Sequence, residues 1–169
     1  MPPEVAISRT VPGAPLIIQP NPVRAYLPKQ FWARDAEYFV YSCEWNTLAL
    51  SAQGQADSFA IANDVDFLVL GVSVIEATAA AGTAEQAFWP VLVMISESGT
   101  GNKWFDSLQQ LHNVAGRGNV DGLGYRPLVY PRFIQGGTEV NVELTNLEAT
   151  ARRVWMSFHG CKIYRARVS

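Results

Sequence analysis

The two histidines are the imidazole bases that this sequence offers for catalysis, so a hydrolytic centre would be sought around them. Nucleophilic hydrolysis needs a nucleophile, a base and a group that orients the base. His112 stands at the head of a glycine-rich loop, and His159 lies inside a predicted strand, where a structural role is expected. Neither is flanked by a Gly-x-Ser-x-Gly elbow. The sequence therefore predicts no catalytic residue, and a hydrolase would require the fold to bring a carboxylate and a nucleophile to His112.

Metal and phosphate sites are not indicated either. The two cysteines, Cys43 and Cys161, do not stand at zinc-ligand spacing from each other or from the histidines. Asn63–Asp66 resembles part of a calcium loop without its glycine and distal glutamate, so a turn is expected there. Gly99–Lys103 lacks the spacing of a phosphate loop and is expected to be a hairpin loop. We predict no metal and no cofactor. Two buried free thiols are the expected state of the cysteines, with a disulfide as the alternative.

The charge content favours neither nucleic acid nor membrane as a partner. Charged residues make up 17% of the chain, against about 25% in an average soluble domain. A net charge of −2 and an acidic middle argue against specific nucleic-acid binding, although five bases gather near the C-terminus. The longest apolar stretches, Phe67–Ile75 and Ala87–Ile95, are about half the roughly 20 residues that a spanning helix needs. The start of the sequence also lacks the pattern of a signal peptide.

Acidic and basic residues are segregated along the chain. Residues 36–102 hold eight acids and no lysine or arginine, whereas the chain from Lys103 onward holds nine bases and five acids. Strands of opposite charge pairing inside one sheet would explain this. Alternatively, the acidic part of one subunit meets the basic arm or C-terminal part of a neighbour in a ring or trimer.

Residues 1–34 are predicted to form an extended N-terminal arm. Seven of the ten prolines occur at or before Pro28, which excludes a helix or a central strand. Apolar residues alternate with the prolines, and a solvated linker would not need them. Fully extended, 28 residues reach on the order of 90 Å. We expect the arm to bind a neighbouring subunit or partner through Arg9, Leu16, Ile17, Ile18, Arg24, Tyr26, Leu27 and Arg34.

Residues 35–169 are predicted to form one β domain. Period-two or β-branched runs predict strands at Tyr38–Trp45, Ser58–Ala62, Asp66–Ala77 and Trp89–Ser96. Leu108–His112 fits a short helical turn or an irregular strand equally well. Glycine-rich and polar clusters separate these runs, and no helical pattern of 10 to 15 residues lies between them.

The C-terminal third predicts two antiparallel strands. Glu139–Thr145 alternates polar and apolar residues, a turn is expected at Asn146–Thr150, and the next strand places Val154, Met156 and Phe158 on one face. Cys161 and Ile163 then continue out of phase, which predicts a β-bulge near His159–Gly160. The fold class predicted is all-β: an antiparallel, jelly-roll-like β-sandwich with an extended proline-rich arm.

The same region carries a family resemblance. Pro131–Leu147 and Arg153–Tyr164 resemble the C-terminal part of small tailed-bacteriophage virion proteins, in which two glycines, an alternating strand, Thr-Asn-Leu, a turn and a last strand ending in Lys-x-Tyr close a β-sandwich. Phe39–Ser42 through Asp66–Val69 also fits that pattern, and the arm lies outside it. The resemblance implies a component that docks on the capsid shell or near the portal and tail.

We therefore predict a non-enzymatic virion structural protein, made in the host cytoplasm, that oligomerises and docks on an assembled phage particle. A capsid decoration or cement protein is the first expectation, and its partners would be further copies of itself, as a trimer or ring, and the major capsid protein. The alternatives are a head-tail connector, collar or fibre-associated component, or a carbohydrate- or receptor-binding module. The last alternative predicts exposed aromatic residues in loops, with Trp104 and Tyr125 the first to examine.

Overall fold

The computed structural model describes residues 27, 29–31, 34–50, 54–78, 90–117 and 125–165, and these form a mostly antiparallel β structure. A 3-10 turn, η2 (Lys29–Phe31), precedes β1. The remaining elements are β1 (Ala36–Leu48), β2 (Gln55–Ala60), β3 (Val65–Thr78), β4 (Val91–Glu97), β5 (Gln109–Gln110), α1 (Leu111–Val114), β6 (Gly116–Arg117), β7 (Arg126–Ile134), β8 (Glu139–Asn146) and β9 (Arg152–Tyr164).

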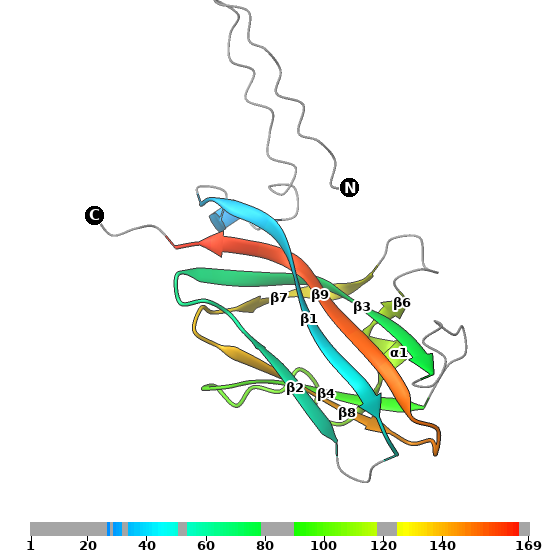
Figure 1. Ribbon diagram of the computed structural model, residues 1–169. Coiled ribbons are helices and arrows are strands. Elements are labelled where there is room, and N and C mark those ends of the chain that lie inside the picture. Colours follow the sequence, from blue (N-terminus) through cyan, green and yellow to red (C-terminus); the bar gives the residue numbers. More distant parts are fainter. Residues whose placement is uncertain are drawn as a thin grey trace, which may run out of the picture.

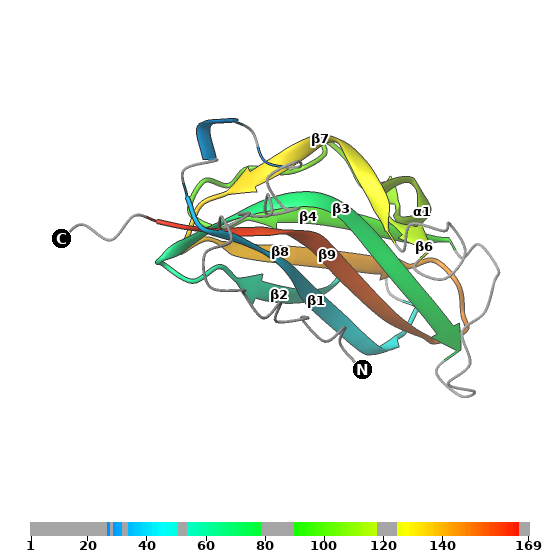
Figure 2. The ribbon, with the colours of Figure 1, turned by 90° about the horizontal axis from the view of Figure 1, so that it is seen from above.

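The strands form two sheets that face each other, as in a β-sandwich (Figure 1). One sheet has the order β1-β9-β3, and the far edge of β3 pairs with both β6 and β7. The other sheet has the order β2-β8-β4-β5. Figure 2 shows the first sheet lying across the second. Four of the antiparallel pairs are nested in the sequence: β1 with β9, β2 with β8, β3 with β7, and β4 with β5.

Alternating apolar residues explain why the two layers close on one core. In β4 every second residue from Val91 is buried, and β8 does the same from Val140 to Leu144. β9 contributes Phe158, whose ring lies 4.9 Å from that of Phe59 in the opposite sheet. Burial of these side chains removes apolar surface from water, which is the main force that holds the sheets together.

The predicted bulge exists, but it lies in β3 and not in β9. β9 stays in register with β1 from Val154 to Ile163, whereas in β3 the extra residue Leu70 falls between the partners of His159 and Gly160. The sequence pattern was therefore interpreted wrongly. Cys161 keeps its place on the outer face of β9 and is buried because a second apolar cluster covers that face.

This second cluster comes partly from the N-terminal segment. It consists of Leu27, Leu68, Cys161 and Ile163, with Phe31, Ala36 and Leu70 packed against it. Leu27 is only 5% exposed, so the described chain begins fixed against the outer face of the first sheet. Gly160 allows the bulge beneath it, because a Cβ on this residue would lie 2.2 Å from the backbone oxygen of Leu68.

Strand β7 was not predicted, because it contains two prolines. Pro127 and Pro131 lack the N–H that a central strand needs, and an edge strand tolerates that loss. β7 pairs with β3 at its two ends, where Arg126 faces Val72 and Ile134 faces Phe67. Between those ends, residues 128–131 leave the ladder as a wide bulge. We call residues 128–131 the β7 bulge.

The other predicted elements agree with the structure. The four predicted strands correspond to β1, β2, β3 and β4, although Trp89 lies outside the described residues. The ambiguous stretch at Leu108–His112 is both a strand and a helical turn, β5 followed by α1. Cys43 and Cys161 are free and buried, as expected. No helix within the described ranges is long and apolar enough to span a membrane.

Candidate functional site

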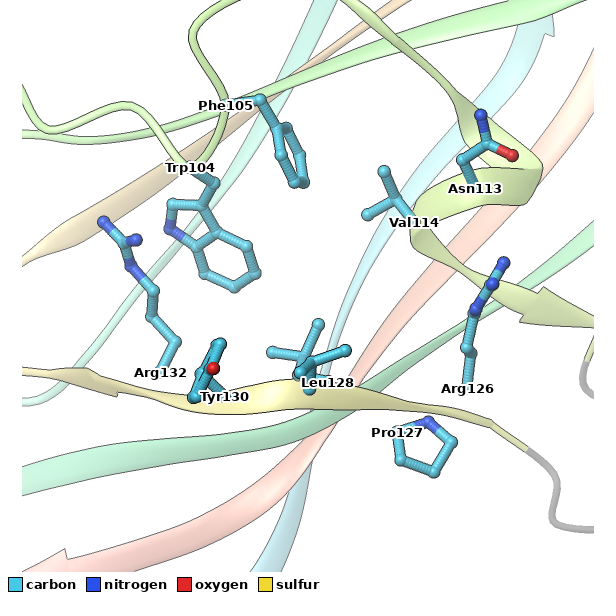
Figure 3. A pocket seen from close by; sticks show the side chains of 10 residues that line it. Trp104, Phe105, Asn113, Val114, Arg126, Pro127, Leu128, Tyr130 and Arg132 are labelled. Carbon is cyan, nitrogen blue, oxygen red and sulfur yellow. The ribbon is translucent and has the colours of Figure 1, made fainter.

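A pocket opens between the β7 bulge, the loop after β4 and helix α1. Its volume is about 360 Å³, and it is lined by Trp104, Phe105, Asn113, Val114, Arg126, Pro127, Leu128, Val129, Tyr130 and Arg132. Figure 3 shows Leu128 rising from β7 toward the space between Trp104 and Val114, with Phe105 on the far side. The volume is in the range that ligand pockets occupy, about 300–1,000 Å³.

One wall of the pocket is held by a buried carboxylate. Glu97, 8% exposed, accepts hydrogen bonds from the indole N–H of Trp104 and from Nε of Arg132, each at 3.0 Å. The Arg132 guanidinium also lies 5.4 Å from the centre of a Trp104 ring, a cation-π contact. Glu97 therefore balances the charge of Arg132 and holds the indole of Trp104 in one orientation. The centres of the Trp104 and Phe158 rings lie 5.8 Å apart, and the two rings are perpendicular.

The opposite wall supplies a second cation. Arg126 donates through NH1 to the backbone oxygen of His112 at 2.7 Å, which ties β7 to α1. Among the described residues that line the pocket there is no carboxylate, and Arg126 adds a positive charge to it. The combination is an apolar floor with guanidinium and amide donors at the rim, and it suits a ligand that is apolar in its body and rich in hydrogen-bond acceptors.

The outer side of the β7 bulge is apolar and exposed to solvent. Val129 is 87% exposed and Tyr130 is 85% exposed, and Phe133 further along the strand is 38% exposed. Large apolar side chains this exposed, side by side on an edge strand, mark a surface suited to a protein contact. The prolines at 127 and 131 remove two N–H groups from this edge, which disfavours pairing with another strand and favours contacts through side chains.

A separate, hydrogen-bonded cluster surrounds His159 on the outer face of the first sheet. Its Nδ1 is 2.6 Å from the hydroxyl of Tyr38, and its Nε2 is 2.8 Å from the hydroxyl of Ser73. The ring of Tyr125 stacks on the imidazole at 4.8 Å. Burial lowers the pKa of His159, which favours the neutral ring at pH 7.

The His159 cluster resembles a nucleophile and its base only in part. Ser73 is 7% exposed, and the group at the other ring nitrogen is the phenol of Tyr38 where a hydrolase would use a carboxylate. The three hydrogen-bonded residues come from β1, β3 and β9, so the cluster joins neighbouring strands. This agrees with the structural role expected for His159.

His112 does meet a carboxylate, as a hydrolase on this scaffold would require. Its Nε2 lies 3.8 Å from Oε1 of Glu76, inside the end of the sandwich. The hydroxyl of Ser73 lies 2.8 Å from an imidazole nitrogen, but that imidazole belongs to His159 and not to His112. Among the described residues, no three His, Cys, Asp or Glu side chains gather as a metal site would need.

Asp66 anchors the segment that leads into the arm. It is 5% exposed and accepts hydrogen bonds from Nε and NH2 of Arg165, at 3.0 and 2.6 Å, and from the backbone N–H of Gly136 at 3.1 Å. Arg34 reaches its other oxygen at 3.3 Å. Burial alone would raise the pKa of Asp66, but the hydrogen bonds from Arg165 and Gly136 and the two positive charges outweigh it and lower that pKa.

Two of the eight predicted arm residues are therefore placed by the structure. Leu27 packs in the second apolar cluster and Arg34 pairs with Asp66, both within one chain. Arg9, Leu16, Ile17, Ile18, Arg24 and Tyr26 lie outside the described residues. The partner-binding role of all eight stays a prediction.

The segregated charges pair within the chain at several points. Glu44 of β1 meets Arg153 of β9 at 3.0 Å, and Glu97 and Asp66 meet bases from the C-terminal part. These contacts are of the kind expected if acidic and basic strands pair inside one domain. The alternative contact between subunits stays a prediction.

The sequence did not predict the pocket, and it pointed to only one of the residues that line it. Trp104 was singled out as an aromatic loop residue, and it does line the pocket, whereas Tyr125 lies on the His159 ring instead. The signal that would have indicated the site is the sequence of residues 126–132, in which two prolines four apart describe a broken edge strand with an arginine at each end.

Comparisons with protein-family models, with curated proteins and with solved structures found no match to this chain.

Proposed function

We propose that this protein is a non-enzymatic virion structural protein that oligomerises and docks on an assembled phage particle, as a capsid decoration or cement protein. A connector, collar or fibre-associated position is the alternative within the same class. The observation that carries the proposal is the apolar surface of the β7 bulge, where Val129 and Tyr130 line the rim of a pocket and are almost fully exposed. Such a surface is stabilised when another protein covers it.

The strand order supports the proposal. The nested pairs β1 with β9, β2 with β8, β3 with β7 and β4 with β5 are what one long hairpin gives when it is wound around a core. We infer a jelly-roll topology from this order. Jelly rolls are used by viral capsid proteins and by lectins, so the fold is compatible with the virion class and with the carbohydrate alternative.

The placement of the N-terminal segment supports an adhesive mechanism. Leu27 and Phe31 pack on the outer face of the first sheet, and Phe31 stacks on Phe133 of β7 at 5.3 Å. The chain preceding residue 27 therefore starts from a fixed point beside the exposed edge. An arm that binds only the assembled particle would stabilise that particle by mass action, because its binding free energy is absent from free subunits.

Deleting residues 1–26 and measuring incorporation into particles tests this function. The deletion should stop at residue 26, because Leu27 belongs to the apolar cluster on the domain itself. Incorporation is expected to fall, while the thermal unfolding midpoint of the isolated domain stays unchanged. A deletion variant that is incorporated as well as the full chain would overturn the adhesive role of the arm.

A carbohydrate-binding module is the second candidate, and the position of Trp104 favours it. Its indole lines a pocket with arginine and amide groups at the rim, and sugars stack on such rings. A glycan array comparing the wild type with Tyr130→Ala and Trp104→Ala would test it. Glycan binding that disappears in both variants would support this candidate, and no binding by the wild type would reject it. Leu50→Ala, at an exposed position that does not line the pocket, is the matched control.

A further inference from the structure

We propose that the pocket beside the β7 bulge binds the proline-rich segment Thr10–Val23 of a neighbouring copy of this chain, in an extended polyproline conformation. The inference rests on the proposed assembly function and names the surface to which the arm attaches. It is argued from the composition of the pocket, the spacing of the arm residues and the length of chain before residue 27.

The apolar surfaces match in their spacing. A polyproline helix has three residues per turn, so residues three apart lie on one face. Pro12, Pro15 and Ile18 stand at that spacing and would form one apolar face. The pocket offers the indole of Trp104 and the side chains of Val114 and Leu128. Aromatic-lined grooves are the usual receptors for such segments.

The hydrogen-bonding groups match as well. Thr10–Val23 contains four prolines, which lack an N–H, and a polyproline helix makes no internal hydrogen bonds, so the segment presents all of its carbonyl acceptors and has more acceptors than donors on its backbone. Within the described part of the chain, Arg126 and Arg132 each commit one N–H, to His112 and to Glu97. A guanidinium carries five such donors, so both have donors left for carbonyl oxygens.

The charges do not oppose this binding. Thr10–Val23 has no charged residue, so the positive charge of the pocket repels nothing in it. A segment carrying basic side chains would be repelled by Arg126.

A neighbouring copy is favoured as the source of the segment. The 26 residues before Leu27 can extend on the order of 80 Å, enough to cross a subunit boundary. Val129 and Tyr130 line the rim of the pocket and are 87% and 85% exposed, which is more apolar surface than a segment bound in the pocket need cover. A neighbour that donates its arm also brings a body that can cover them.

Disulfide trapping in the full-length chain tests the contact. One variant carries Ile18→Cys in the arm and the other carries Tyr130→Cys at the pocket, the two are co-produced with tags of different size, and mixed dimers are followed on a non-reducing gel. Tyr130 is 85% exposed, so its replacement leaves the core intact. The matched control replaces Tyr130→Cys by Leu50→Cys, which is 56% exposed, lies beyond the end of β1 and does not line the pocket.

The native thiols give little background in this experiment. Burial, with the charge of Asp57 adding to it, raises the pKa of Cys43 to about 12. Burial raises the pKa of Cys161 to about 11. Both therefore stay protonated at pH 8, and the thiolate is the reactive form.

The expected result is a mixed dimer that forms at least about tenfold faster with Tyr130→Cys than with Leu50→Cys, because a bound arm holds the two thiols at millimolar effective concentration. Equal rates for the two positions would overturn the proposed contact. A single chain carrying both Ile18→Cys and Tyr130→Cys that closes on itself, without mixed dimers, would show that each arm fills its own pocket and would overturn the exchange between copies. If deleting residues 1–26 still abolishes self-association while no trapping occurs, the assembly function stands and this site for the arm is wrong.

Discussion

Replacing Asp66 by asparagine should destabilise the domain far more than replacing a surface carboxylate. Asp66 is 5% exposed and accepts three hydrogen bonds at Oδ1, two from Arg165 and one from Gly136, and one from Arg34 at Oδ2. Hydrogen bonds to charged groups contribute about 1.5–3 kcal/mol each when well buried. Arg34 and Arg165 have side chains 39% and 44% exposed, so solvent screening reduces their share. We expect Asp66→Asn to lower the free energy of unfolding by about 2–3 kcal/mol at pH 7.

The destabilisation caused by Asp66→Asn should decrease as the pH falls. The pKa of Asp66 is lowered in the folded protein, because the arginine and backbone hydrogen bonds outweigh the effect of burial. Its stabilisation is therefore fully present above the unfolded pKa of about 3.9 and is lost as the pH falls toward the lower folded value. The difference between wild type and Asp66→Asn should be constant from pH 7 to about pH 5 and should shrink below about pH 4.

Urea unfolding followed by tryptophan fluorescence measures both effects by linear extrapolation. Glu44→Gln is the matched control, since it removes the carboxylate of an exposed ion pair. The side chain of Glu44 is 42% exposed and that of its partner Arg153 is 39% exposed. That change should cost no more than about 0.5 kcal/mol. The reasoning is refuted if Asp66→Asn costs no more than Glu44→Gln, or if its cost is the same at pH 3 as at pH 7.

Three further changes probe the fold around the site. Gly160→Ala should prevent normal folding or lower the unfolding midpoint strongly in a thermal melt, because its Cβ would lie 2.2 Å from the backbone oxygen of Leu68; a melt like that of the wild type would contradict the close approach. Phe158→Ala should lower the free energy of unfolding by about 3–5 kcal/mol in urea, and a loss below 1 kcal/mol would contradict its place at the centre of the core. Cys43 and Cys161 should resist a thiol reagent at pH 8 until denaturant is added, and rapid labelling of either in the native protein would contradict their burial.

The strands with strong period-two patterns were predictable from the sequence. β8 alternates polar and apolar residues along its length, and β3 is rich in Val, Leu and Ile, so burial on one or both faces dictates an extended chain. The turn after β8 was also predictable, since Asn146 accepts a bond from the backbone N–H of Glu148 as turn-forming residues do.

Features that depend on contacts between distant segments could not be predicted. The buried Cys161 and Ile163 look out of phase in β9 because the pattern does not reveal that Leu27 covers the outer face. The bulge they seemed to require lies at Leu70 on the neighbouring strand.

The pocket likewise depends on a tertiary arrangement. Its walls come from the loop after β4, from α1 and from β7, and the prolines of β7 made that segment look unlike a strand. Its chemistry is visible only once Glu97 is seen to hold both Trp104 and Arg132. From the sequence we therefore identified one aromatic residue of the pocket, and the signal in residues 126–132 can be interpreted only once β7 is known to be an edge strand.

Light scattering of the full-length protein and of residues 27–169 tests the central claim most directly. The monomer has a mass of 18.6 kDa, so a trimer or ring is distinguished without ambiguity. An arm that joins subunits predicts an oligomer for the full chain and a monomer for the shortened one. A monomer in both forms, or the same oligomer in both, would contradict an assembly role for the arm.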